Sequence, residues 1–221
     1  MRLMSPRRQR ALHPAGRSMT GELRVWGCPR PVGSTLLDMP GLHRVTVRLS
    51  KGLGTRGDRP DVRGVAIRVA RPEGVNDLLL STVGLFGRVP VPRRSFDADY
   101  GTITPYRAGL GKVHLAAGPD RTGRPIGRSL DALDAGGGLI LYAVRDGVRQ
   151  PFGKLTLGAF LPATADAELA FDPIRNTTED LYPTGRLHAT RAFAYRLSQR
   201  WRGARPAPSN PPAVARTATN R

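Results

Sequence analysis

Short stretches of alternating apolar and polar residues, separated by turn-forming residues, dominate this sequence. The clearest is RVTVRLS at 44–50, where the two valines and the leucine fall on one side of a strand and Thr46, Arg48 and Ser50 on the other. Gly, Pro and Asp fill the intervals between such stretches, and helical periodicity is missing from most of them. The pattern predicts a mainly β fold, an antiparallel barrel or sandwich of about eight strands. The expected strands are 22–26, 44–50, 62–70, 75–81, 111–117, 138–145, 152–160 and 167–171.

One segment has helical periodicity instead. In residues 185–204, the side chains of one face recur every three or four positions, and Gly203 is placed to end the helix. The first nine residues and the Pro-rich stretch 204–221 match neither element and are expected to be disordered. The sequence thus predicts one folded domain over 10–203, between a disordered N-terminus, 1–9, and a disordered tail.

Charge and cysteine content restrict the classes of function. The 221 residues carry 35 Lys and Arg against 17 Asp and Glu, a net charge of +18 that suits polyanionic partners. The arginines are scattered and few aromatic residues accompany them, which argues against specific nucleic-acid binding. Cys28 is the only cysteine, so an intrachain disulfide and a cysteine-based zinc site are excluded. Since neither a signal peptide nor an apolar run of about 18 residues is present, a cytoplasmic protein without membrane association is expected.

A candidate site lies in the predicted helix. Arg191 and Tyr195 are four residues apart, so their side chains would meet, and the guanidinium would favour the phenolate form of the tyrosine. A phenolate is a hard anionic ligand that suits ferric haem iron. On this stretch alone, a buried aromatic residue beside a solvated arginine is the better interpretation.

A stretch near the N-terminus also allows two interpretations. In RALHPAGRSMTGELRV at 10–25, Gly16 and Gly21 are expected to form tight turns ahead of a strand. The alternative is that Arg10 and His13 form half of an active site whose other half lies much later in the chain.

Taken together, the two stretches resemble the distal and proximal haem motifs of haem-dependent catalases. Arg-x-x-His-x-x-Gly-x-x-x-x-Gly at 10–21 is similar to the distal motif, and Arg-x-Phe-x-Tyr-x-x-Ser-Gln-Arg-x-Arg at 191–202 to the proximal one. Three blocks between them follow the family's order: 45–81, FGKLTLG at 152–158 and FDPIRN at 171–176. The resemblance covers about residues 10–203 and is weak over 82–150.

The resemblance implies an antiparallel eight-stranded β-barrel with a C-terminal proximal α-helix and haem b held beside the barrel. It implies an oxidoreductase that acts on peroxides. Family enzymes are tetramers joined by interlocking arms that have no counterpart in this sequence. The oligomeric state is therefore left open, a homo-oligomer included.

Individual roles follow from the resemblance, residue by residue. His13 corresponds to the distal catalytic histidine, a general acid–base for peroxide, and Ser50 to the serine that orients it. Tyr195 corresponds to the axial ligand of the haem iron, and Arg191 to the arginine that tunes this ligand. The arginines that correspond to the propionate-binding set are Arg10, Arg48 and Arg202.

Two positions depart from the family pattern. Ser81 stands where the family has a distal asparagine that helps to bind peroxide, and Gly52 where a bulky valine guards the substrate channel. Both changes favour larger organic hydroperoxides over hydrogen peroxide. We therefore expect a haem peroxidase that uses an unidentified reductant, or a weak catalase. Two alternatives stay open: a non-enzymatic haem-binding protein of the same fold, and a basic barrel that binds nucleic acid.

Overall fold

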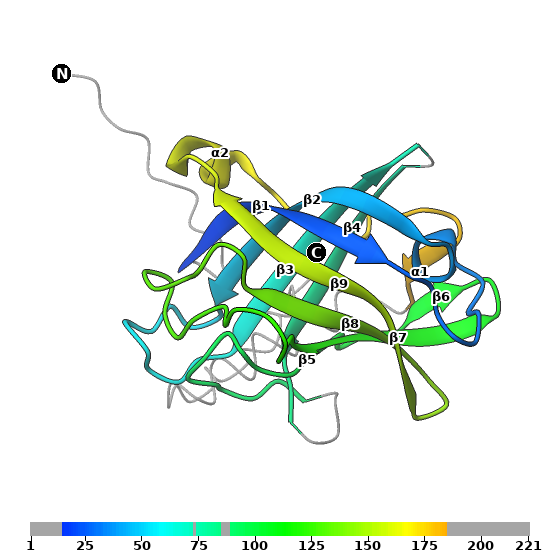
Figure 1. The fold of residues 1–221 in the computed structure, drawn as a ribbon, viewed down its shortest axis with the longest axis horizontal. Helices are drawn as coiled ribbons and strands as arrows, with labels where there is room; N and C mark the ends of the chain where they lie inside the picture. Colours follow the sequence, from blue (N-terminus) through cyan, green and yellow to red (C-terminus); the bar gives the residue numbers. More distant parts are fainter. Residues whose placement is uncertain (1–14, 73, 85–88, 185–221) are drawn as a thin grey trace, which may run out of the picture.

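A closed ring of antiparallel strands forms the molecule in the computed structural model, which describes residues 15–72, 74–84 and 89–184 (Figure 1). The ring runs in the order β1 (Ala15–Val25), β2 (Gly41–Lys51), β3 (Arg63–Arg71), β4 (Gly74–Thr82), β5 (Tyr100–Gly101), β7 (Gly111–Pro119), β8 (Gly138–Arg145) and β9 (Val148–Phe160), and β9 pairs with β1 again. Two short strands, β6 (Tyr106–Ala108) and β10 (Leu181–Pro183), extend the sheet beside β7. The fold is a closed eight-stranded antiparallel barrel, which is one of the two architectures that the alternating pattern predicts and the one that the family resemblance implies.

Helices contribute little to the described part of the chain. The two α-helices are α1 (Thr35–Asp38) and α2 (Ala163–Glu168). Within these described ranges, no helix has the length and apolar character that crossing a membrane requires. The expected proximal helix, 185–204, lies outside the described residues, as do both termini that were expected to be disordered.

The ring has eight strands, as predicted, but one of the predicted strands is wrong. Residues 167–171 do not form a strand, because the first two of them end the segment Ala-Thr-Ala-Asp-Ala-Glu, which folds into α2. Alternation over five residues is too short to separate a strand from a helix end, and alanine and glutamate favour the helix. The eighth strand is instead β5, whose two residues complete the ring between β4 and β7.

The two glycines expected in turns near the N-terminus lie inside β1. Gly16 pairs with Ser50 of β2. At Gly21 an added Cβ atom would lie 3.0 Å from the carbonyl oxygen of Thr156 in β9. The turn prediction is therefore wrong at both positions. At Gly21 the reason for glycine is the close approach of a neighbouring strand.

The inward face of the strands supplies the core. Met19, Val47, Ile67 and Leu78 are register partners across β1, β2, β3 and β4, and none is more than 1% exposed. The alternation in 44–50 is thereby confirmed: its apolar residues point into the barrel and its polar residues point outward. Continuous packing of one face leaves the outer face of the same strands free for other roles.

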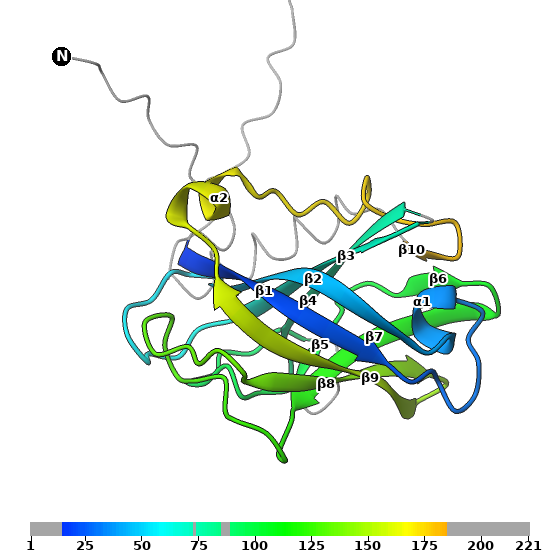
Figure 2. The same cartoon turned by 45° about the horizontal axis from the view of Figure 1, so that its top comes forward.

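The connection from α2 to β10 crosses the outside of the barrel (Figure 2). It contains FDPIRN, which is fastened to β4 by the buried carboxylate of Asp77. That carboxylate accepts the backbone N–H of Asp172 at 2.7 Å and the amide of Asn176 at 2.8 Å. It also accepts two hydrogen bonds from Arg68, each 2.8 Å long. The FDPIRN block therefore serves the fold by holding this connection against the barrel.

Candidate functional site

A row of small residues crosses the outer face of five strands. Partners in antiparallel strands place their side chains on the same face of the sheet. Ser50 of β2 pairs with Gly64 of β3, and Gly64 pairs with Ser81 of β4. The row is completed at its ends by Gly16 of β1 and Gly101 of β5. The outer face of the barrel thus has a strip with two hydroxyl groups and three positions without a side chain.

Ser50 and Ser81, two of the predicted site residues, lie on the same outer face of the barrel. Ser50 is buried, and its Oγ donates to the carbonyl oxygen of Gly64 at 3.4 Å. Ser81 stands on the other side of Gly64, so the two serine strands are about 10 Å apart. Gly64 is buried and places no side chain between the two hydroxyls.

Arg48 lies in the next row of the same face, beside Ser18 of β1 and Ala66 of β3. Its guanidinium covers Gly16, where an added Cβ would come within 2.5 Å of the guanidinium carbon. Its Nε is 3.4 Å from a carboxylate oxygen of Asp166 in α2. A guanidinium that is only 6% exposed needs an anionic or polar partner, and here the chain supplies a carboxylate. The small-residue row therefore has a buried cation at one edge.

Five of the predicted site residues lie outside the described residues. They are Arg10, His13, Arg191, Tyr195 and Arg202. Their roles stay predictions, and the structure describes only the part of the site that the barrel wall contributes.

Gly52 has a local structural role. An added Cβ would lie 3.1 Å from the carbonyl oxygen of Val62, to which the Gly52 N–H donates at 2.7 Å. The loop that follows is held by Asp61, whose carboxylate accepts the backbone N–H groups of Leu53 and Thr55. A larger residue at position 52 would press on this loop, which is a sufficient reason for glycine here.

Two buried cations that the sequence analysis did not select lie at the end of the barrel. Lys51 and Arg63 are register partners on β2 and β3 and are at most 1% exposed. Burial, and secondarily the charge of Arg63, lowers the pKa of Lys51. Its Nζ donates to the carbonyl oxygens of Thr55 at 2.7 Å and Gly57 at 2.6 Å. The rarity of lysine in this arginine-rich chain is the only sequence signal for this position, and its contacts serve the loop.

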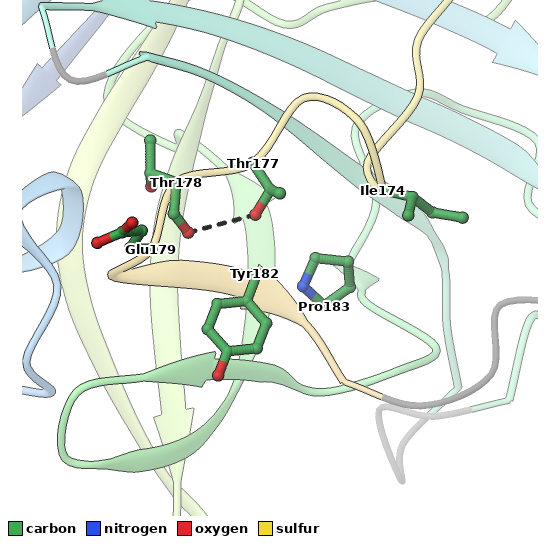
Figure 3. A pocket seen from close by; sticks show the side chains of 6 residues that line it. All are labelled: Ile174, Thr177, Thr178, Glu179, Tyr182 and Pro183. Atoms are coloured by element: carbon green, nitrogen blue, oxygen red, sulfur yellow. Dashed lines mark hydrogen bonds between the residues drawn. The ribbon is translucent and has the colours of Figure 1, made fainter.

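A surface pocket of about 570 Å³ lies elsewhere, against β10 (Figure 3). Figure 3 shows Tyr182 and Pro183 of β10 beside Thr177, Thr178 and Glu179 of the preceding loop. None of the predicted site residues lines this pocket. Within the described ranges, no group of three or more His, Cys, Asp or Glu residues could hold a metal ion. The small-residue row with Arg48 remains the best candidate site.

Comparisons with known proteins agree with the barrel. No family model matches the sequence, and no curated protein matches it. The structure superposes on a fungal catalase with a TM-score of 0.61 at 14% identity, covering 88% of this chain and 59% of that one. It superposes on catalase A from Saccharomyces cerevisiae with a TM-score of 0.62 at 13% identity, covering 89% and 61%. The chain thus spans about three fifths of the length of these catalases, and its fold is that of the catalase barrel core.

Proposed function

We propose that this chain binds haem b and acts as an oxidoreductase on peroxides. The observation that carries the proposal is the small-residue row, which flanks Gly64 with Ser50 and Ser81 on the outer face of a catalase-like barrel. The fold needs neither hydroxyl for its core, since the opposite faces of these strands supply the packing.

The described residues fit a planar dicarboxylic cofactor. Gly64 and Gly101 have no side chain that would keep a flat macrocycle away from the strands, and the buried guanidinium of Arg48, which covers Gly16, suits a propionate. By the family resemblance, Arg10 and Arg202 would bind propionates and Tyr195 would be the axial ligand of the iron.

When bound, haem supplies the iron-centred redox chemistry that peroxide reduction needs. His13, by resemblance, accepts a proton from the peroxide and returns it to the departing oxygen. Ser50 would orient that histidine, and the hydroxyl of Ser81 would donate a hydrogen bond to the bound peroxide. A serine is shorter than asparagine, so the site favours an organic hydroperoxide with a separate reductant.

The test is the absorption spectrum of the full chain produced with adequate haem, before and after addition of an organic hydroperoxide. We expect a Soret band of the ferric tyrosinate type that responds to the peroxide. In Tyr195→Phe the band should shift or disappear, and an unchanged spectrum would refute the axial role of Tyr195. In His13→Ala the haem content should be kept and the peroxide response lost.

The same measurements separate the alternatives. A non-enzymatic haem protein would show the Soret band without any response to peroxide in the wild type. A nucleic-acid-binding barrel would bind no haem and would bind nucleic acid with an affinity that falls steeply as salt increases.

A further inference from the structure

The short helix α2 is attached to the described part of the barrel by a side chain on its inner side, Asp166. None of the α2 side chains is buried, and its N-terminus has no side-chain cap. Figure 2 shows α2 beside the beginning of β1, at one end of the barrel. A single-turn helix without a buried face has little stability of its own. The chain on either side of α2 is held by the Leu161 N–H, which donates to the Ser18 carbonyl oxygen, and by Arg68, which donates to the Ala170 carbonyl oxygen. Between these two points, the position of the helix depends on what Asp166 contacts.

Asp166 contacts the same two strands that carry the candidate site. One carboxylate oxygen accepts a hydrogen bond from the hydroxyl of Ser18 in β1 and lies 3.4 Å from Nε of Arg48 in β2. Ser18 and Arg48 are register partners, and both are buried. We call these two contacts the Asp166 bridge. It joins α2 to the outer face at the edge of the small-residue row.

The bridge places a carboxylate on the arginine that the proposed function assigns to a propionate. A guanidinium attracts a carboxylate of either source through the same opposite charge. An acidic ligand that reaches Arg48 must therefore share it with Asp166 or take its place. In both cases the charge of Asp166 lowers the affinity of the site for a carboxylate.

We propose that Asp166 regulates access to Arg48: its carboxylate occupies the arginine in the ligand-free chain, and a haem propionate displaces it and releases α2. The identity of the ligand rests on the proposed function. The attachment of α2 through Asp166 does not, because it follows from contacts within the chain.

The first experiment tests the attachment without haem, by hydrogen exchange of the peptide that contains residues 163–169. Asp166→Asn and Asp166→Ala should raise its exchange rate at least threefold over wild type, and the alanine variant should have the larger effect. The matched control is Glu168→Gln, which removes the same charge from an exposed position of the same helix and should leave the rate unchanged. Equal exchange in wild type and both Asp166 variants would overturn the proposal.

The second experiment titrates the same proteins with haem and follows the Soret band. Asp166→Asn should bind haem about threefold to tenfold more tightly than wild type, the range expected when one competing ion pair is removed. Haem should also raise the exchange rate of 163–169 in wild type and leave it unchanged in Asp166→Asn. An Asp166→Asn protein that binds haem as weakly as wild type, or more weakly, would overturn the competition.

The two experiments separate this inference from the proposed function. If neither wild type nor Asp166→Asn binds haem, the proposed function and the displacement by haem are both overturned. The exchange of 163–169 still decides the attachment of α2 in that case. If only Asp166→Asn binds haem, the competition is supported in its strongest form.

Discussion

The two faces of β2, β3 and β4 differ in what they are needed for. On the inner face, Val47, Ile67 and Leu78 are almost fully buried and pack as neighbours in one apolar row. On the outer face, the row through Ser50, Gly64 and Ser81 offers little apolar area to bury. The inner face accounts for the core of the barrel, and the outer row contributes little to it.

The outer face is itself divided. Near the other end of β3 and β4, Arg68 and Asp77 are register partners joined by two hydrogen bonds, and they fasten the connection to β10. Polar residues on an outer face are thus no proof of a binding site. The distinction lies in how much each polar group contributes to the stability of the fold, and this can be tested by comparing the free energies of unfolding of variants.

The largest effect is expected at Asp77. Asp77→Ala leaves Arg68, the Asp172 N–H and the Asn176 amide without their shared acceptor. Loss of one partner from a buried ionic network should lower the free energy of unfolding by about 3–5 kcal/mol. Chemical denaturation measures it, and limited proteolysis should show faster cleavage within 171–178. A loss below about 1 kcal/mol would show that the Asp77 network does not stabilise the fold substantially.

A somewhat smaller loss is expected on the inner face. Ile67→Ala removes three buried carbon atoms from a fully packed row and should cost about 3 kcal/mol. Leu79→Ala is the matched control on the neighbouring strand, because Leu79 faces outward and is 38% exposed. It should cost less than about 1 kcal/mol. Equal losses in the two variants would contradict the assignment of the faces.

A pH-dependent effect is expected from the ion pair that joins the end of β7 to β9. Lys154 Nζ lies 2.6 Å from the carboxylate of Asp120, and this hydrogen bond, with a second from Thr122, lowers the pKa of Asp120 from 3.8 to about 2. Because the folded state holds the lower pKa, the stabilisation is full above about pH 4 and is lost as pH falls toward 2. Because the Lys154 side chain is partly exposed, the ion pair should stabilise the folded state by about 1 kcal/mol.

Denaturation midpoints between pH 2 and 7 test this directly. Asp120→Asn should be less stable than wild type at pH 7 and should approach it at pH 2. A constant difference across the range would show that the ion pair does not cause the pH dependence.

The smallest effect on stability is expected in the small-residue row. Ser81→Ala should change the free energy of unfolding by less than about 0.5 kcal/mol. Ser50→Ala should lower it by no more than about 1 kcal/mol, because the buried hydroxyl of Ser50 donates to the carbonyl oxygen of Gly64. The same variants should lower the rate of reaction with an organic hydroperoxide. A large loss of stability without any loss of reactivity would make the row a structural feature.

The sequence predicted the strands that show a clear alternation of apolar and polar residues. The side-chain period of two is unambiguous over the seven residues of 44–50, so the residues of the inner face and those of the outer face were predicted correctly. β5 has only two residues and no periodicity, so no local pattern could reveal it. The error at 167–171 has the same origin, since a five-residue alternation also fits the end of a helix.

The sequence motifs predicted two residues of the candidate site but not their arrangement. Ser50 and Ser81 were predicted from the block that resembles the family, and the strand register then showed that they lie on either side of Gly64. The Asp166 bridge could not be predicted in this way. Ser18 and Asp166 are 148 positions apart, and no local sequence pattern around a single aspartate identifies so distant a contact.

The most direct test of the account is a haem titration of wild type and Gly64→Val, with thermal unfolding of both proteins as the control for folding. A valine suits a β-strand and would place a branched side chain between Ser50 and Ser81 on the outer face. We predict a Soret band with saturable binding in wild type, and its loss in a Gly64→Val protein that still unfolds cooperatively. The absence of haem binding in wild type, or equal affinity in the two folded proteins, would contradict the claim that this row is the haem-binding face.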